Sequence, residues 1–111
     1  MDEKIPYSDF EKLDLRVGKI ISVGEHSNAD KLYVLEVDFG ELGKRTIVAG
    51  LKKHYEKKDL IEKKAVFAVN LEPVKLRGVE SNGMILAAVN GEEKVIYIAP
   101  EGDIEEGAKI R

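Results

Sequence analysis

The stretch "KLYVLEVDFG", residues 31–40, alternates side chains with a period of two. One set of alternating residues, Tyr33, Leu35, Val37 and Phe39, is apolar throughout, whereas the other set ends in two carboxylates. Such alternation is typical of a half-buried β-strand. We therefore expect the apolar set to face a core.

The neighbouring residues extend this strand into a sheet. A period of two also begins at Leu15 and predicts a long first strand, in which Gly18 is expected to mark a bulge or bend. "EHSNAD", residues 25–30, is rich in turn formers and predicts a loop. After the second strand, "ELGK" predicts a hairpin turn with Gly43 in a left-handed conformation, followed by a third strand, "RTIVAG".

The second half of the chain returns to strands after one helical stretch. "LKKHYEKKDLIEKK", residues 51–64, predicts a helix, and "AVFAVNL", residues 65–71, a fourth strand that Pro73 ends. "MILAAVN" and "KVIYIAP" predict a closing hairpin, followed by a loop and a short terminal strand. Residues 1–13 are expected to form a short helical segment with Ser8 as its N-cap.

This order of elements favours an all-β fold. We predict a five-stranded oligonucleotide/oligosaccharide-binding (OB) barrel over residues 14–111, with a helix between strands three and four and a C-terminal β extension. An open α+β sheet is the alternative. At 111 residues the chain fits one domain.

The net charge of −3 hides a strong asymmetry along the chain. Residues 1–43 carry −5, residues 44–77 carry +6 and residues 78–111 carry −4. A clustered patch matters more to an anionic partner than the total does, and the middle third supplies one. The alternative is that its lysines (Lys52, Lys53, Lys57 and Lys58) form a solvated helix face.

The sequence contains no catalytic or metal-binding pattern. His26 and His54 lie far apart, Cys is absent, and both histidines are expected in loops or on the surface. No Gly-rich phosphate loop or nucleophile elbow occurs, so we predict neither an enzyme nor a cofactor. The acidic N-terminus does not resemble a secretory signal and no apolar run could cross a membrane, so we expect a cytoplasmic protein.

A binding surface fits the residues better. In small barrels of this class, strands two and three and the adjoining loops receive nucleic acid. Lys31, Arg45, Lys75 and Arg77 are predicted to converge there and to engage phosphates. Alternatively, Lys31 and Arg45 protect strand edges from aggregation.

Residues 75–84 form a basic elbow between two apolar segments. Ser81 offers a hydrogen-bonding hydroxyl and Met84 an adaptable apolar contact, and we expect both to touch nucleotide and to lie outside the core. Tyr33 and Tyr55 could stack on bases or belong to the packing.

The chain resembles the tRNA-binding domain family, which is found in methionyl-tRNA synthetases, in endothelial-monocyte-activating polypeptide and as free-standing tRNA-binding proteins. Four segments carry the resemblance, in order and at the expected spacing: "DLRVGKI" (14–20), "HSNADKLYVLEVDFG" (26–40), "RTIVAGL" (45–51) and "NLEPVKLRGVESNGMILAA" (70–88). The resemblance implies an OB barrel that dimerises through its C-terminal extension and binds the tRNA elbow with little sequence preference. The implied binding residues are Lys31, Arg45, Lys75, Arg77, Ser81, Met84 and, in the neighbouring loop, Asn28.

The resemblance also implies partners. A homodimer, or a domain or subunit that serves a methionyl-tRNA synthetase catalytic chain, would fit, and Met1 favours a separate chain. Apolar residues at 84–89 and 95–99 exceed what a five-stranded barrel needs and favour dimerisation. One branch of the family resembles an export chaperone, which is the alternative reading: Met84, Tyr33 and nearby leucines would then bind unfolded peptides.

Overall fold

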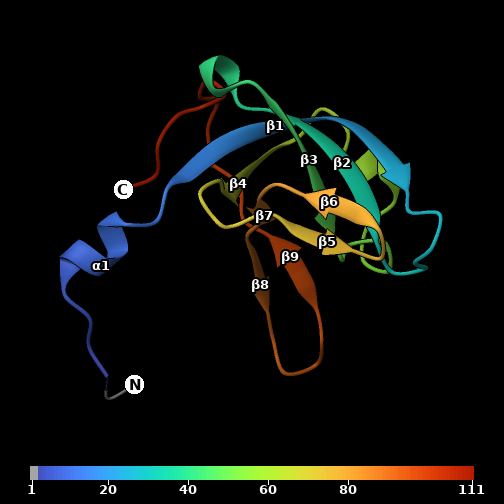
Figure 1. Ribbon diagram of the computed structural model, residues 1–111, viewed down its shortest axis with the longest axis horizontal. Helices are drawn as coiled ribbons and strands as arrows, with labels where there is room; N and C mark the ends of the chain where they lie inside the picture. Colours follow the sequence, from blue (N-terminus) through green and yellow to red (C-terminus); the bar gives the residue numbers. More distant parts are fainter. Residues whose placement is uncertain (1–2) are drawn as a thin grey trace.

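Five antiparallel strands form the main sheet of the computed structural model, which describes residues 3–111 (Figure 1). In spatial order they are β3 (Lys44–Ala49), β2 (Tyr33–Asp38), β1 (Leu15–Glu25), β4 (Lys64–Ala68) and β7 (Met84–Ile85). The long strand β1 pairs with β4 through residues 15–19 and with β2 through residues 19–25. Its register shifts between Ile20 and Ser22, and this bulge lets one strand serve both halves of the sheet.

The sheet curves until its two edge strands meet. The Asn82 N–H, just before β7, donates to the Thr46 carbonyl of β3 at 2.9 Å. The C-terminal segment lies along the start of β1, where the Ile110 N–H donates to the Leu15 carbonyl at 2.8 Å. The result is a nearly closed antiparallel barrel, which confirms the predicted all-β OB fold over the open sheet.

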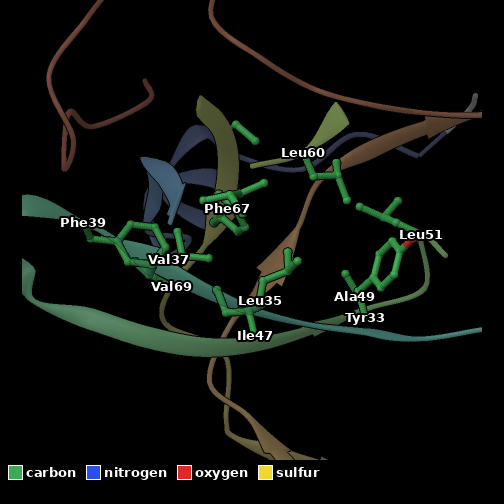
Figure 2. Close-up of a cluster of buried hydrophobic side chains, with 12 residues drawn as sticks. Tyr33, Leu35, Val37, Phe39, Ile47, Ala49, Leu51, Leu60, Phe67 and Val69 are labelled. Carbon is green, nitrogen blue, oxygen red and sulfur yellow. The ribbon is translucent and has the colours of Figure 1, made fainter. Parts of the chain in front are cut away.

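The alternating apolar residues of β2, continued by Phe39 just after it, form the centre of the core, as predicted. Tyr33, Leu35, Val37 and Phe39 are all buried, and Phe39 packs edge-on against Phe67 of β4 with ring centroids 5.3 Å apart (Figure 2). Gly18 has a different role from the expected bulge. A Cβ there would lie 2.6 Å from the Phe39 ring, so Gly18 makes room for the core.

Two short hairpins complete the strands. The β8 (Ala87–Val89) and β9 (Val95–Tyr97) pair confirms the predicted closing hairpin and projects from the barrel (Figure 1). The sequence did not predict the second hairpin, β5 (Val74–Leu76) with β6 (Val79–Ser81), which is the basic elbow itself. Arg77 and Gly78 join its strands with φ of 54° and 92°, as a two-residue type I′ turn requires.

The helices differ from the prediction. Between β3 and β4 the chain forms the short 3-10 helix η2 (Lys57–Asp59), and a second one, η1 (Gly40–Leu42), links β2 to β3. The α-helix predicted over residues 51–64 is wrong because Leu51 and Leu60, its buried residues, do not make the continuous apolar stripe that holds a helix to a core.

The N-terminal helix α1 (Tyr7–Glu11) begins after Pro6 rather than Ser8. Ser8 lies inside the helix, and no side chain caps it. Residues 1 and 2 of the predicted helical segment, including Met1, lie outside the described residues.

Candidate nucleic-acid interface

The β1–β2 loop and the tip of the β5–β6 hairpin lie side by side at one end of the barrel (Figure 1). Between them is an open groove of about 360 Å³, which we call the basic groove. Its walls are Ala29, Asp30, Lys31 and Leu32 from the loop and Arg77 from the hairpin. The groove is therefore built from two segments that are distant in sequence.

Some of the described lysine and arginine side chains around the groove form ion pairs with carboxylates, and others do not. Within residues 3–111, no carboxylate lies within 4.0 Å of the charged groups of Lys31, Lys75 or Arg77, and all three side chains are exposed. These cations therefore remain available to an external anion. Two of them, Lys31 and Arg77, line the basic groove.

The lysines between β3 and β4 are mostly paired. Lys52 and Lys57 both reach Glu25, at 2.5 Å and 3.5 Å, and Lys58 lies 3.4 Å from Glu56. The hydrogen bond from Lys52 lowers the pKa of Glu25 below its ordinary value, so this carboxylate keeps its charge near the lysines. Lys52, Lys57 and Lys58 are thus balanced by carboxylates, whereas, over residues 3–111, Lys75 and Arg77 of the hairpin are not.

Arg45 lies apart from the groove. Its guanidinium donates to the Val69 carbonyl and lies 5.9 Å from the centroid of the Phe39 ring. Arg45 lies at the start of β3, opposite Val37. Lys31 lies beyond the other end of β3, where its carbonyl accepts the Lys52 N–H. At about 3.3 Å per residue the two positions are roughly 20 Å apart. A role for Arg45 in RNA binding stays a prediction.

Ser81 belongs to the fold, contrary to the expectation that it lies outside the core. It is 3% exposed, and its hydroxyl accepts the Val48 N–H at 2.9 Å and donates to the Gly83 carbonyl at 3.0 Å. Met84, in contrast, is 50% exposed on β7. RNA contact by either residue stays a prediction, and the bonds of Ser81 join the base of the hairpin to β3.

The two tyrosines proposed as stacking platforms belong to the packing. Tyr33 is buried and its hydroxyl donates to the Tyr55 carbonyl at 2.9 Å. The Tyr55 ring packs on Tyr97 with centroids 5.2 Å apart. Tyr33 is therefore closed to a base or a peptide, and Tyr55, which is half-buried, packs within the fold.

His26 lies in the β1–β2 loop, as expected, but its burial and its bonds were not predicted. It is 5% exposed, its Nδ1 accepts the Asn28 N–H at 3.0 Å, and its Nε2 lies 2.9 Å from the Leu76 carbonyl. The second bond joins residues 50 apart in the chain, and no local pattern could indicate it. His54 is exposed, as expected.

Two exposed apolar areas lie near these features. Leu71, Val74, Leu76 and Met84 are exposed around the β5–β6 hairpin. Val89 and Ile96 of the β8–β9 hairpin and Ile98 just after it are exposed as well. Over the described part of the chain, no group of His, Asp and Glu side chains could hold a metal ion, and no helix is long and apolar enough to cross a membrane.

Comparisons with known proteins agree with this picture. The family model described as "Putative tRNA binding domain" matches residues 15–109. The chain is 54% identical over 109 residues to a methionine–tRNA ligase from Pyrococcus horikoshii, covering 98% of this chain and 15% of the synthetase. The chain thus spans about a seventh of that relative's length.

Solved structures show the same fold in chains that match this one over almost their whole length. A MetRS related protein from Pyrococcus horikoshii superposes with a TM-score of 0.92 at 35% identity, covering 98% of this chain and 99% of the other. The chaperone CsaA from Bacillus anthracis superposes with a TM-score of 0.90 at 32% identity, covering 98% and 100%.

Proposed function

This chain belongs to the tRNA-binding domain family, and we propose that it is a non-catalytic module that binds tRNA by shape and charge with little sequence preference. Lys31, Lys75 and Arg77 are its phosphate-binding residues, and Asn28 lies in the same loop as Lys31. Contacts of this kind position a protein on RNA without reading its sequence.

One observation carries the proposal: Lys31 and Arg77, which line the basic groove, have no carboxylate partner among the described residues, whereas Lys52, Lys57 and Lys58 do. Arg77 adds to this argument. Its φ of 54° is a conformation that Asn and Gly adopt more readily than Arg. We attribute the arginine at this strained turn position to a need for its charge there.

We further propose that two copies act together in the cytoplasm. The exposed apolar residues Val89, Ile96 and Ile98 would be covered in a two-fold dimer, the commonest symmetry of small oligomers. A dimer presents two basic grooves to one bent RNA and gains avidity from their fixed separation. The match to part of a methionine–tRNA ligase supports a role as an accessory domain or subunit of such a synthetase.

Peptide binding is the second candidate. The exposed side chains of Leu71, Val74, Leu76 and Met84 could receive an unfolded peptide, and the likeness to the chaperone CsaA supports this reading. The unpartnered cations have no evident use in it, so tRNA binding is the stronger proposal.

Fluorescence anisotropy separates the two candidates. Labelled bulk tRNA and a labelled unfolded peptide are each titrated with the protein at two salt concentrations. We expect tRNA to bind with an affinity that falls steeply with salt, because phosphate contacts release counterions. Salt-insensitive peptide binding with no tRNA binding would contradict the proposal and support the chaperone reading.

A further inference from the structure

The β5–β6 hairpin stands apart from the five-stranded sheet as a two-stranded sheet of its own. Its base is joined to β3 by the Val48 N–H to Ser81 Oγ bond and the Asn82 N–H to Thr46 carbonyl bond, both 2.9 Å long. Two-stranded hairpins are marginally stable in water without further packing. Val74, at the start of β5, is 53% exposed, so apolar burial holds this strand weakly. The position of the tip therefore depends on another contact.

His26 supplies that contact. The Asn28 N–H can only donate, so Nδ1 of His26 must accept, and Nε2 must carry the hydrogen that the Leu76 carbonyl receives. The ring is nearly excluded from water, where such bonds are stronger than at an exposed site. One side chain thus ties the loop to the strand that leads into the turn.

The two residues that His26 bonds stand next to the walls of the basic groove. Asn28 directly precedes residues 29–32, which form one wall, and Leu76 directly precedes Arg77, which forms the other. The imidazole ring therefore bridges the two segments that carry Lys31 and Arg77. His26 itself is buried and offers RNA almost no surface.

We propose that His26 is a positioning residue for RNA binding: it holds the loop and the hairpin tip at a fixed separation, so that Lys31 and Arg77 meet neighbouring phosphates without prior ordering. This inference rests on the proposed function. Without the tether the hairpin samples other positions, and the apparent affinity falls with the fraction of protein in the competent arrangement. The contacts made in the complex stay the same.

Two substitutions test the two hydrogen bonds of the His26 ring one at a time. In His26→Asn the amide oxygen can still accept the Asn28 N–H, but the side chain is too short to reach Leu76. In His26→Gln the longer amide reaches about as far as Nε2 and can donate to the Leu76 carbonyl. We expect His26→Asn to weaken tRNA binding about fivefold, the equivalent of one net hydrogen bond, and His26→Gln to weaken it less.

The salt dependence of tRNA binding tests whether His26 positions the cations or contacts a phosphate itself. Loss of a direct phosphate contact, as in Arg77→Ala, lowers the slope of log affinity against log salt by about 0.7–0.9. His26→Asn should leave that slope unchanged while lowering the affinity at every salt concentration. A slope reduced as in Arg77→Ala would overturn the positional role.

Tyr33→Phe is the matched control, because it removes one hydrogen bond of a buried ring whose partner, the Tyr55 carbonyl, belongs neither to the groove walls nor to the hairpin. Both Tyr33→Phe and His26→Asn should lower the melting temperature, but only His26→Asn should weaken tRNA binding. Equal affinity losses in the two variants would mean that His26 acts through stability alone.

Amide hydrogen exchange tests the tether without RNA. Hairpin amides of the free protein should exchange faster in His26→Asn than in wild type, relative to amides of β2. Unchanged hairpin exchange would refute the tether, whether or not tRNA binds. If His26→Asn exchanges its hairpin amides faster, as expected, but the wild-type protein binds no tRNA, the tether stands and the proposed function is refuted.

A measurement on the wild-type protein covers the case in which neither variant folds. The ¹⁵N spectrum of the His26 ring should show an unprotonated Nδ1 and a protonated Nε2, with the same pattern before and after tRNA is added. A different tautomer, or a direct contact between the ring and RNA, would overturn the inference.

Discussion

Replacing Arg77 with Asn should stabilise the protein and weaken its binding to tRNA. Arg77 is the first residue of a two-residue turn and has φ of 54°, followed by Gly78 at 92°. The left-handed region is unfavourable by about 1–2 kcal/mol for most L-residues, and Asn tolerates it better. A net gain of about 1 kcal/mol in the free energy of unfolding follows, which corresponds to a rise of roughly 4 °C in melting temperature.

The same substitution removes an unpartnered cation from the basic groove. A hydrogen bond to a charged group contributes about 1.5 kcal/mol, so we expect affinity for tRNA to fall about tenfold. The salt slope should fall by about 0.7–0.9, the value for one phosphate contact. Thermal unfolding followed by circular dichroism and anisotropy titrations in a salt series measure both effects.

Glu93→Asn is the matched control. Glu93 is exposed in the β8–β9 turn with φ of 62°, so the substitution relieves a similar conformation without removing a cation. It should raise the melting temperature comparably and leave the salt slope unchanged. If Arg77→Asn raises stability but binds tRNA with wild-type affinity and slope, the assignment of Arg77 to the interface is refuted.

Three further outcomes are expected. Ser81→Ala should destabilise the protein by about 1–3 kcal/mol in denaturant unfolding, because it leaves the buried Val48 N–H without an acceptor, and an unchanged midpoint would contradict this role. If Ile98 faces a partner copy, Ile98→Asp should shift the mass measured by light scattering to that of the 12.4 kDa monomer and weaken tRNA binding. A wild-type protein that is already monomeric and binds tRNA tightly would refute the dimer. The hydrogen bond from Arg16 lowers the pKa of Asp14 in the folded protein, so the carboxylate stabilises the fold above its unfolded pKa and loses that effect as the pH falls through its folded pKa. Urea unfolding should therefore show that Asp14→Asn is less stable than wild type at neutral pH and equally stable in acid. A stability difference that is independent of pH would exclude this linkage.

The sequence predicted those features that local patterns encode. The alternation of Tyr33, Leu35, Val37 and Phe39 identified both a strand and its buried face, and Gly43 identified a turn. The helix over residues 51–64 failed because charge and propensity are local, whereas a helix in a small barrel needs a buried stripe. Tertiary packing decided that segment.

The site was predictable in composition and less so in geometry. Lys31 and Arg77 could be placed near each other because a loop and an elbow adjoin in barrels of this class. The bonds of Arg45 to the Val69 carbonyl and of His26 to the Leu76 carbonyl join residues that are distant in the sequence, and neither has a local signature. Ser81 was misplaced for the same reason, since its partner Val48 lies on a different strand.

The central claim is that the unpartnered cations bind RNA phosphates, and a salt series with two triple variants tests it most directly. Lys31→Ala/Lys75→Ala/Arg77→Ala removes the three unpartnered cations of the loop and hairpin, and the control Lys52→Ala/Lys57→Ala/Lys58→Ala removes the same charge from the carboxylate-paired lysines. We predict that the first variant lowers the salt slope of tRNA binding by about 2–3, at 0.7–0.9 for each contact, and that the control keeps a slope near that of wild type. Equal slopes for wild type and the first variant, or a larger loss in the control, would contradict the account.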